Sequence, residues 1–134
     1  MITPGTLNLR AGRHVPFTYT MDFVGIDLTG ADLQAQVRLK PDTPGSPLID
    51  LPDGVLSGAT GLRFLSVSTT DGIPTSIVTM FITEADMEDG AKVPSAVEPG
   101  DDVTLSWDMQ ITPSGGVKSV YLRGAFIVEG GVTQ

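Results

Sequence analysis

The chain has no cysteine, one histidine and one tryptophan among its 134 residues. Without thiols it forms no disulfide, and no thiolate is available as a metal ligand or nucleophile. His14 cannot form a nucleophile–base pair with a cysteine or a metal site with a second imidazole, so we expect it to be structural or merely exposed. Because cysteine is absent, redox chemistry does not assign a compartment.

Positive charge is also scarce, with 8 Lys and Arg against 16 Asp and Glu and a formal net charge of -8. Binding to nucleic acid requires clustered cations that neutralise phosphates, and here the cations are scattered, so we expect no nucleic-acid partner. An acidic surface favours solubility and can steer the protein toward a basic partner. The cations are Arg10, Arg13, Arg38, Lys40, Arg63, Lys92, Lys118 and Arg123.

Long hydrophobic runs are missing as well, and none approaches the length that spans a bilayer. The first ten residues lack the basic and apolar segments of a signal peptide, so we expect synthesis in the cytoplasm of the producing cell and no membrane partner. A chain of this length forms one domain, residues 1–134. With Gly 16 and Pro 10, it is interrupted too often for long helices, which favours many short strands.

Alternation of apolar and polar residues predicts seven to nine strands. The run 103–111 alternates most strictly, and the run 75–83 is apolar on both faces, as in a central or subunit-covered strand. Apolar positions 15, 17, 19 and 21 should share one face of the second strand, and positions 33, 35, 37 and 39 one face of the third. The expected strands cover residues 6–9 (an edge strand broken by Gly12), 14–23, 32–40, 48–51, 62–68, 75–83, 103–111 and 117–128.

Turn and cap residues separate these strands. Asp53–Gly54 and Asp71–Gly72 are typical turns, and the proline-rich loop 41–47 is a candidate contact with a partner. Thr83 followed by Asp86 predicts the start of one short helix that ends before Gly90. The fold class predicted from these signals is all-β: an Ig-like antiparallel β-sandwich with one short helix.

No set of residues predicts catalysis. The acidic group Glu84, Asp86, Glu88 and Asp89 lacks the ligand loop and glycine of an EF-hand, so a solvated helix is favoured over a Ca²⁺ site. Asp101 and Asp102 are interpreted as turn residues. Nothing selects a carboxylate pair for glycoside hydrolysis, and no glycine-rich segment has the spacing and lysine of a phosphate loop. We therefore expect no enzyme activity, cofactor or metal.

Trp107 allows two interpretations: an aromatic platform at a ligand site, or a core residue on the inward face with Leu105 and Met109. The flanking alternation favours the core interpretation. Asp108 should then point outward or toward a loop.

Four landmarks extend over nearly the whole chain: the early strand Phe17, Thr18, Tyr19 and Thr20; the turn and strand within DFVGIDLTGADLQAQVRLKP; Trp107 with Asp108; and the ending LRGAFIVEGGVTQ. In this order they resemble a small β-sandwich domain found in structural proteins of tailed phages, including the N-terminal part of baseplate upper proteins that attach receptor-binding fibres. Baseplate upper proteins continue into a fibre-binding region beyond this domain, whereas this sequence stops at Gln134.

The resemblance implies a structural virion protein that docks in the tail tip or baseplate and helps to attach fibres or receptor-binding proteins. Its partners would be other virion proteins, its copies multiple and its location the virion. Two alternatives stay open. One is a capsid decoration or head-to-tail connector protein, and the other is a carbohydrate-binding module, which would need exposed aromatic residues.

Overall fold

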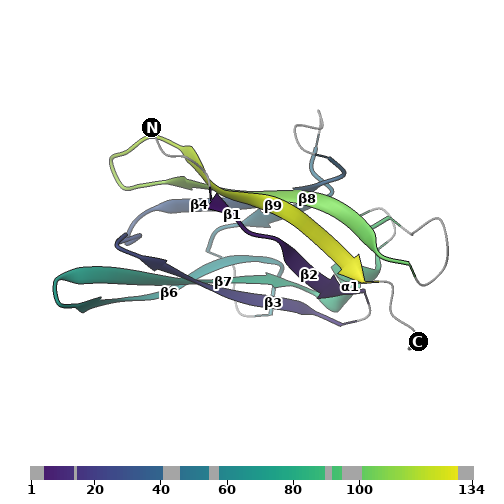
Figure 1. Ribbon diagram of the computed structural model, residues 1–134, viewed down its shortest axis with the longest axis horizontal. Helices are drawn as coiled ribbons and strands as arrows, with labels where there is room; N and C mark the ends of the chain where they lie inside the picture. Colours follow the sequence, from purple (N-terminus) through teal and green to yellow (C-terminus); the bar gives the residue numbers. More distant parts are fainter. Residues whose placement is uncertain are drawn as a thin grey trace.

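The computed structural model describes residues 5–13, 15–40, 46–54, 58–89, 92–94 and 101–129. In these ranges the chain folds into two β-sheets packed face to face, with one short helix at one end (Figure 1). The predicted all-β sandwich is therefore confirmed. His14 and most of the proline-rich loop lie outside the described residues.

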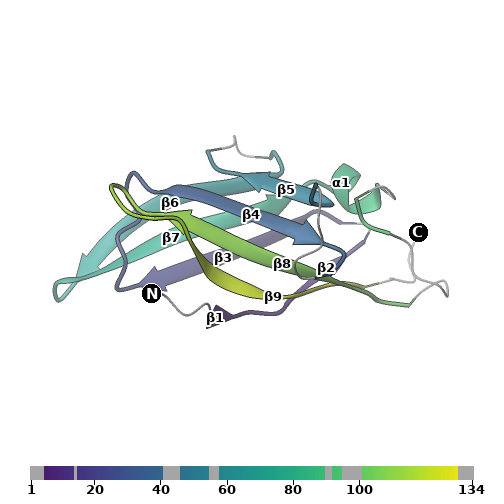
Figure 2. The same ribbon diagram turned by 90° about the horizontal axis from the view of Figure 1, so that it is seen from above.

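The larger sheet has the strand order β1-β9-β8-β4-β5, with β2 also paired to β9 (Figure 2). Its strands are β1 (Gly5–Thr6), β2 (Leu9–Gly12), β4 (Asp32–Arg38), β5 (Ile49–Pro52), β8 (Val103–Thr112) and β9 (Ser119–Glu129). The smaller sheet has the order β3-β7-β6, and its strands are β3 (Phe17–Val24), β6 (Gly61–Thr70) and β7 (Ile73–Ile82). The helix α1 covers Glu84–Glu88.

Turn chemistry fixes the hairpin of the smaller sheet. Asp71 and Gly72 both have positive φ, 52° and 79°, which matches the two-residue turn whose twist suits a β-hairpin. Thr70 consequently pairs with Ile73, and the two ten-residue strands β6 and β7 extend from that point. The turn was predicted from the Asp-Gly pair, but both strands are longer than the hydrophobic pattern indicated.

The core lies between the sheets and follows the alternation of the sequence. On β8, Leu105, Trp107, Met109 and Ile111 are buried, and the residues between them are not. On β7, the buried side chains are Ser76, Val78, Met80 and Ile82. This strand lies between β3 and β6 and is the central strand of its sheet, so its inner face is covered without a second subunit.

Three local predictions are wrong. The first edge strand is interrupted at Leu7 and Asn8, and Gly12 is its last residue rather than its breaker. It pairs with β9 in parallel, the one departure from antiparallel pairing among the named strands. Val15 and Leu39 are about half exposed, at 54% and 50%, because they lie just beyond the ends of β3 and β4, where no facing sheet covers them.

The interruption at Leu7 and Asn8 has a specific cause. The indole Nε1 of Trp107 donates a hydrogen bond of 2.8 Å to the backbone oxygen of Leu7, and the amide of Ala125 donates to the Asn8 side chain at 3.0 Å. Gly124 pairs with Trp107 across the strands, and a Cβ on Gly124 would lie 2.1 Å from the Leu7 oxygen. Glycine is therefore required here, because a side chain would displace the N-terminal segment.

We expect Trp107→Ala to lower the free energy of unfolding by about 3–5 kcal/mol, because it leaves a large cavity in the core. Trp107→Phe keeps most of the ring volume but leaves the Leu7 oxygen without its donor, at a cost of about 1–3 kcal/mol. Denaturant unfolding measures both, with Thr104→Ala on the opposite face as the control. Native tryptophan fluorescence typical of full solvent exposure would contradict this burial.

Gly124→Ala should cost about 1–3 kcal/mol through overpacking against Leu7. The Leu7 N–H donates to the backbone oxygen of Arg123 at 2.9 Å, and its hydrogen exchange should accelerate in this variant. Exchange in β7 should stay slow. Ser106→Ala, a small change on the outer face of neighbouring β8, is the matched control. A Gly124→Ala variant as stable as the wild type would show that Leu7 does not need this close approach.

Candidate functional surfaces

The predicted acidic group does not converge on one point. Glu84, Glu88 and Asp89 are exposed, whereas Asp86 is half-buried against the body of the sandwich. In the described part of the chain, no three His, Cys, Asp or Glu residues are placed so that they could hold a metal ion. The group therefore consists of a solvated helix face and one carboxylate with structural partners.

Asp86 belongs to the cap of α1. The hydroxyl of Thr83 accepts a hydrogen bond of 3.2 Å from the Asp86 amide, as the capping pattern predicted. The backbone amide of Thr83 is satisfied by Thr60 and not by a residue of the helix. The Thr60 hydroxyl accepts from the Thr83 amide at 3.0 Å and donates to the Asp86 carboxylate at 2.5 Å. Thr60 precedes β6, so this cap ties the helix to a strand distant in sequence.

The Asp86 carboxylate also accepts from the Lys92 ammonium at 2.7 Å. This bond to Lys92, together with the one from Thr60, holds the pKa of Asp86 below its usual value. In the same way the bond to Asp86 raises the pKa of Lys92. Both charged forms are stabilised by folding.

We expect Asp86→Asn to flatten the pH dependence of stability on the acid side. The folded-state pKa of Asp86 is depressed, so its contribution is present above its unfolded pKa of about 3.9 and is lost as pH falls through the lower folded value. Thermal unfolding from pH 7 downward measures this, with Glu84→Gln, on the same helix but exposed, as the control. Equal acid limbs in wild type and Asp86→Asn would refute the role assigned to the pair.

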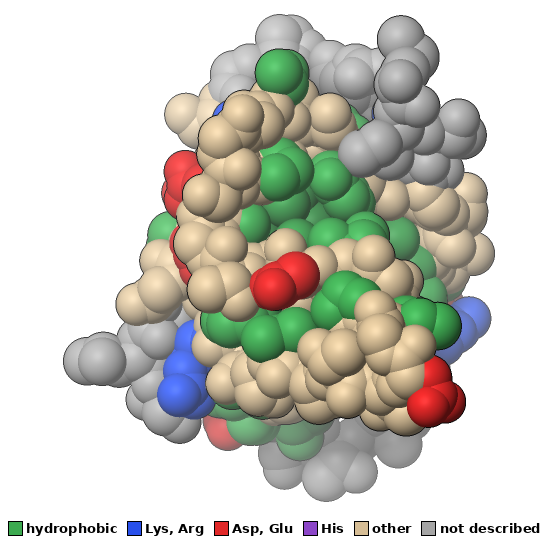
Figure 3. Space-filling view, turned by 90° about the vertical axis from the view of Figure 1, so that its left-hand side faces the viewer, with side chains coloured by type: hydrophobic (Ala, Val, Ile, Leu, Met, Phe, Trp, Pro, Cys, Tyr) green, Lys and Arg blue, Asp and Glu red, His purple; other side chains and the backbone are tan. Residues whose placement is uncertain are grey.

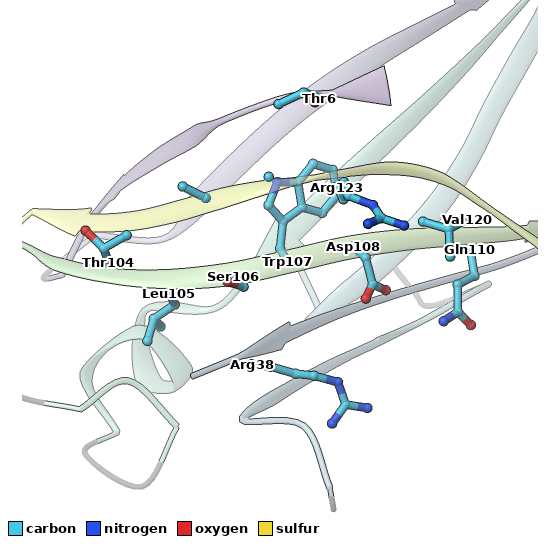
Figure 4. Close-up of a pocket in the computed structure, with 12 residues that line it drawn as sticks. Thr6, Arg38, Thr104, Leu105, Ser106, Trp107, Asp108, Gln110, Val120 and Arg123 are labelled. Atoms are coloured by element: carbon cyan, nitrogen blue, oxygen red, sulfur yellow. The ribbon is translucent and has the colours of Figure 1, made fainter. Parts of the chain in front are cut away.

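Trp107 is 3% exposed, so it cannot serve as an aromatic platform, and the predicted core interpretation is confirmed. Asp108 lies on the other face of β8, between Gln36 of β4 and Arg123 of β9. Figure 4 shows Asp108 and Gln110 extending from β8 on the side opposite Trp107. The prediction that Asp108 points away from the core is confirmed.

The outer face of the larger sheet contains a shallow hollow of about 490 Å³ (Figure 4). Ser106 and Ala125, which pair across β8 and β9, are small residues on this face, and longer side chains stand around them. The longer residues that line it are Arg38, Asp108, Gln110, Val120 and Arg123. Sequence reasoning missed this hollow, because its lining comes from four strands, β1, β4, β8 and β9, that are paired only in the folded sheet.

The outer face of the smaller sheet is uncharged along β7. Ile77 and Phe81 are half-buried there, and Thr75 and Thr79 alternate with them. Thr20 on β3 lies opposite Thr79, with 3.4 Å between their hydroxyl oxygens. The predicted apolar surface on this strand is therefore a narrow stripe between threonines.

A second apolar surface lies at one end of the molecule. Val117 in the β8–β9 loop is 82% exposed, Val24 at the end of β3 is 69% exposed and Ile73 at the start of β7 is 51% exposed. We call these three residues the apolar end. Figure 3 views this end of the molecule and shows hydrophobic side chains gathered across its middle. Exposed apolar side chains that gather in this way are typical of interaction sites.

Comparison with known proteins does not identify this chain. No family model matches it, and no curated protein matches it either. In the described residues, no helix is long and apolar enough to cross a membrane.

Proposed function

We propose that this protein is a structural virion component of a tailed phage, which docks in the tail tip or baseplate and helps to attach fibres or receptor-binding proteins. It acts by fixed contact with other virion proteins, in several copies, and performs no catalysis. The proposal starts from the sequence landmarks that resemble baseplate upper proteins.

The observation that carries the proposal is the apolar end. Its three side chains come from a strand end, a strand start and a loop, all exposed on the folded domain. Burying such side chains in a partner removes apolar surface from water, which is favourable by about 25 cal/mol per Å² before the entropy cost of docking is subtracted. Side chains already exposed on a folded domain require no further folding when they dock. These properties suit a component that is assembled once and stays in place.

The alternatives receive less support. A carbohydrate-binding module would need an exposed aromatic platform, and the single tryptophan is buried. A capsid decoration or head-to-tail connector protein would use the same kind of apolar contact, so location distinguishes it from a tail component. Labelling intact particles from the producing cells with an antibody to this chain, followed by electron microscopy, makes that distinction. Label on the head would favour the alternative, and particles without the protein would refute a virion role.

We predict that Ile73→Asp blocks incorporation into particles and leaves the purified domain folded, because it places a charge on the apolar end. Leu39→Asp is the matched control, since Leu39 is exposed to the same degree, 50% against 51%, at the opposite end of the sandwich. Mass spectrometry of purified particles measures incorporation, and thermal unfolding measures folding. Normal incorporation of the Ile73→Asp protein would refute docking through this end.

A further inference from the structure

The two sheets have four edges. At three of them the edge strand has a feature that hinders pairing with a further strand. β5 has four residues and includes Pro52, β1 and β2 are short and separated by an interruption, and β6 shifts register between Phe64 and Ser66. Such features protect edges against pairing with another chain. β3 has none of them: it is eight residues long, pairs with β7 without a shift, and contains no proline, glycine or lysine.

The hydrogen-bond pattern identifies which backbone groups of β3 face this edge. The amide of Gly25 donates to the oxygen of Pro74, and the hairpin turn makes Thr70 and Ile73 a bonded pair. Along two antiparallel strands, residue pairs that are hydrogen-bonded to each other alternate with pairs that are not. Both observations therefore agree that residues 74, 76, 78, 80 and 82 of β7 form their backbone hydrogen bonds with β3, and that the residues between them bond to β6. The N–H and C=O groups that point away from β7 belong to Thr18, Thr20, Asp22 and Val24, all exposed residues. No strand in the described residues pairs with them.

The inward face of β3 is also incompletely covered. Phe17 and Met21 are buried, whereas Tyr19 and Phe23 are only half-buried although they face the core. Two aromatic residues are therefore partly exposed beside eight unpaired backbone groups. A strand added at this edge would cover both.

We propose that β3 pairs with β3 of a second copy, antiparallel and about a two-fold axis at Met21, so that the two smaller sheets join into one. This register brings Thr18 opposite Val24 and Thr20 opposite Asp22 of the second copy. It forms about eight backbone hydrogen bonds, two for each of four bonded pairs, and uses every outward group of the strand.

The side chains distinguish this register from its neighbours. On the inward face it places Tyr19 opposite Phe23 of the second copy, twice by symmetry, which is a favourable cross-strand pair. On the outward face, the Thr20 hydroxyl can donate to Asp22 of the second copy. A two-fold axis at Asp22 would oppose two carboxylates, and one at Thr20 would leave Val24 without a partner strand. The proposal does not depend on a virion role, because it concerns the purified chain alone.

The test is the mass in solution over a dilution series, measured by light scattering or sedimentation on the full chain. We expect twice 14.1 kDa for the wild type. Thr20→Asp places like charges opposite each other twice and should weaken dimerisation about tenfold. Thr20→Lys, at the same exposed position, places an ammonium opposite Asp22 and should keep or tighten the dimer. A wild type that stays at 14.1 kDa, or Thr20→Asp and Thr20→Lys variants that dimerise equally, would overturn the proposal.

Hydrogen exchange tests the register itself. In the wild-type dimer, the amides of Thr18, Thr20, Asp22 and Val24 should be protected, and dilution to the monomer should remove that protection. Protection at Tyr19 and Met21, which bond to β7, should remain. Rapid exchange at Val24 alone in the dimer would show an axis at Thr20 and refute the register. Rapid exchange at all four would refute pairing through β3.

Discussion

The bond between the Trp107 indole and the Leu7 carbonyl determines how one side of the sandwich is closed. β1 is only two residues long and β2 only four, too short to hold the N-terminal segment against β9 by pairing alone. The indole of Trp107 is buried in the core, and its hydrogen bond to Leu7 holds the chain in place between β1 and β2. Gly124 permits this contact because it has no side chain where Leu7 crosses. The N-terminal segment then occupies the edge of β9, and β3 is left as the long regular edge of the molecule.

Local signals predicted a large part of this fold. Strict alternation on β8, the Asp71–Gly72 turn and the Thr83 cap are each determined within a few residues, and each is present in the structure. What sequence reasoning missed depends on contacts between distant residues. The parallel pairing to β9 and the closeness of Thr60 to Thr83 exist only after the sheets pack. Leu39 continued the alternating pattern of β4, but nothing in the pattern shows that the facing sheet has already ended.

The candidate surfaces were harder to predict than the fold for the same reason. The apolar end joins residues that are far apart in sequence, and each of them is a single exposed apolar residue at the end of a strand or in a loop. The hollow on the larger sheet depends on which small residues become neighbours across β8 and β9. The β7 stripe was recognised from its pattern, because both of its faces belong to one strand, although threonines make it narrower than the pattern indicated. Patterns within one strand therefore predicted faces, whereas surfaces assembled from several elements required the three-dimensional arrangement.

The two proposals have a joint geometric consequence. Antiparallel pairing of β3 makes the two strands run in opposite directions, so the end of β3 in one copy lies beside the start of β3 in the other. Val24 is at the end of β3, and Ile73 lies close by at the start of β7, where Val24 pairs with Thr75. A dimer formed through β3 would thus carry one apolar end at each of its two extremities. A single copy docks one partner through such an end, whereas the dimer would present two identical apolar ends and could contact two copies of one partner on opposite sides.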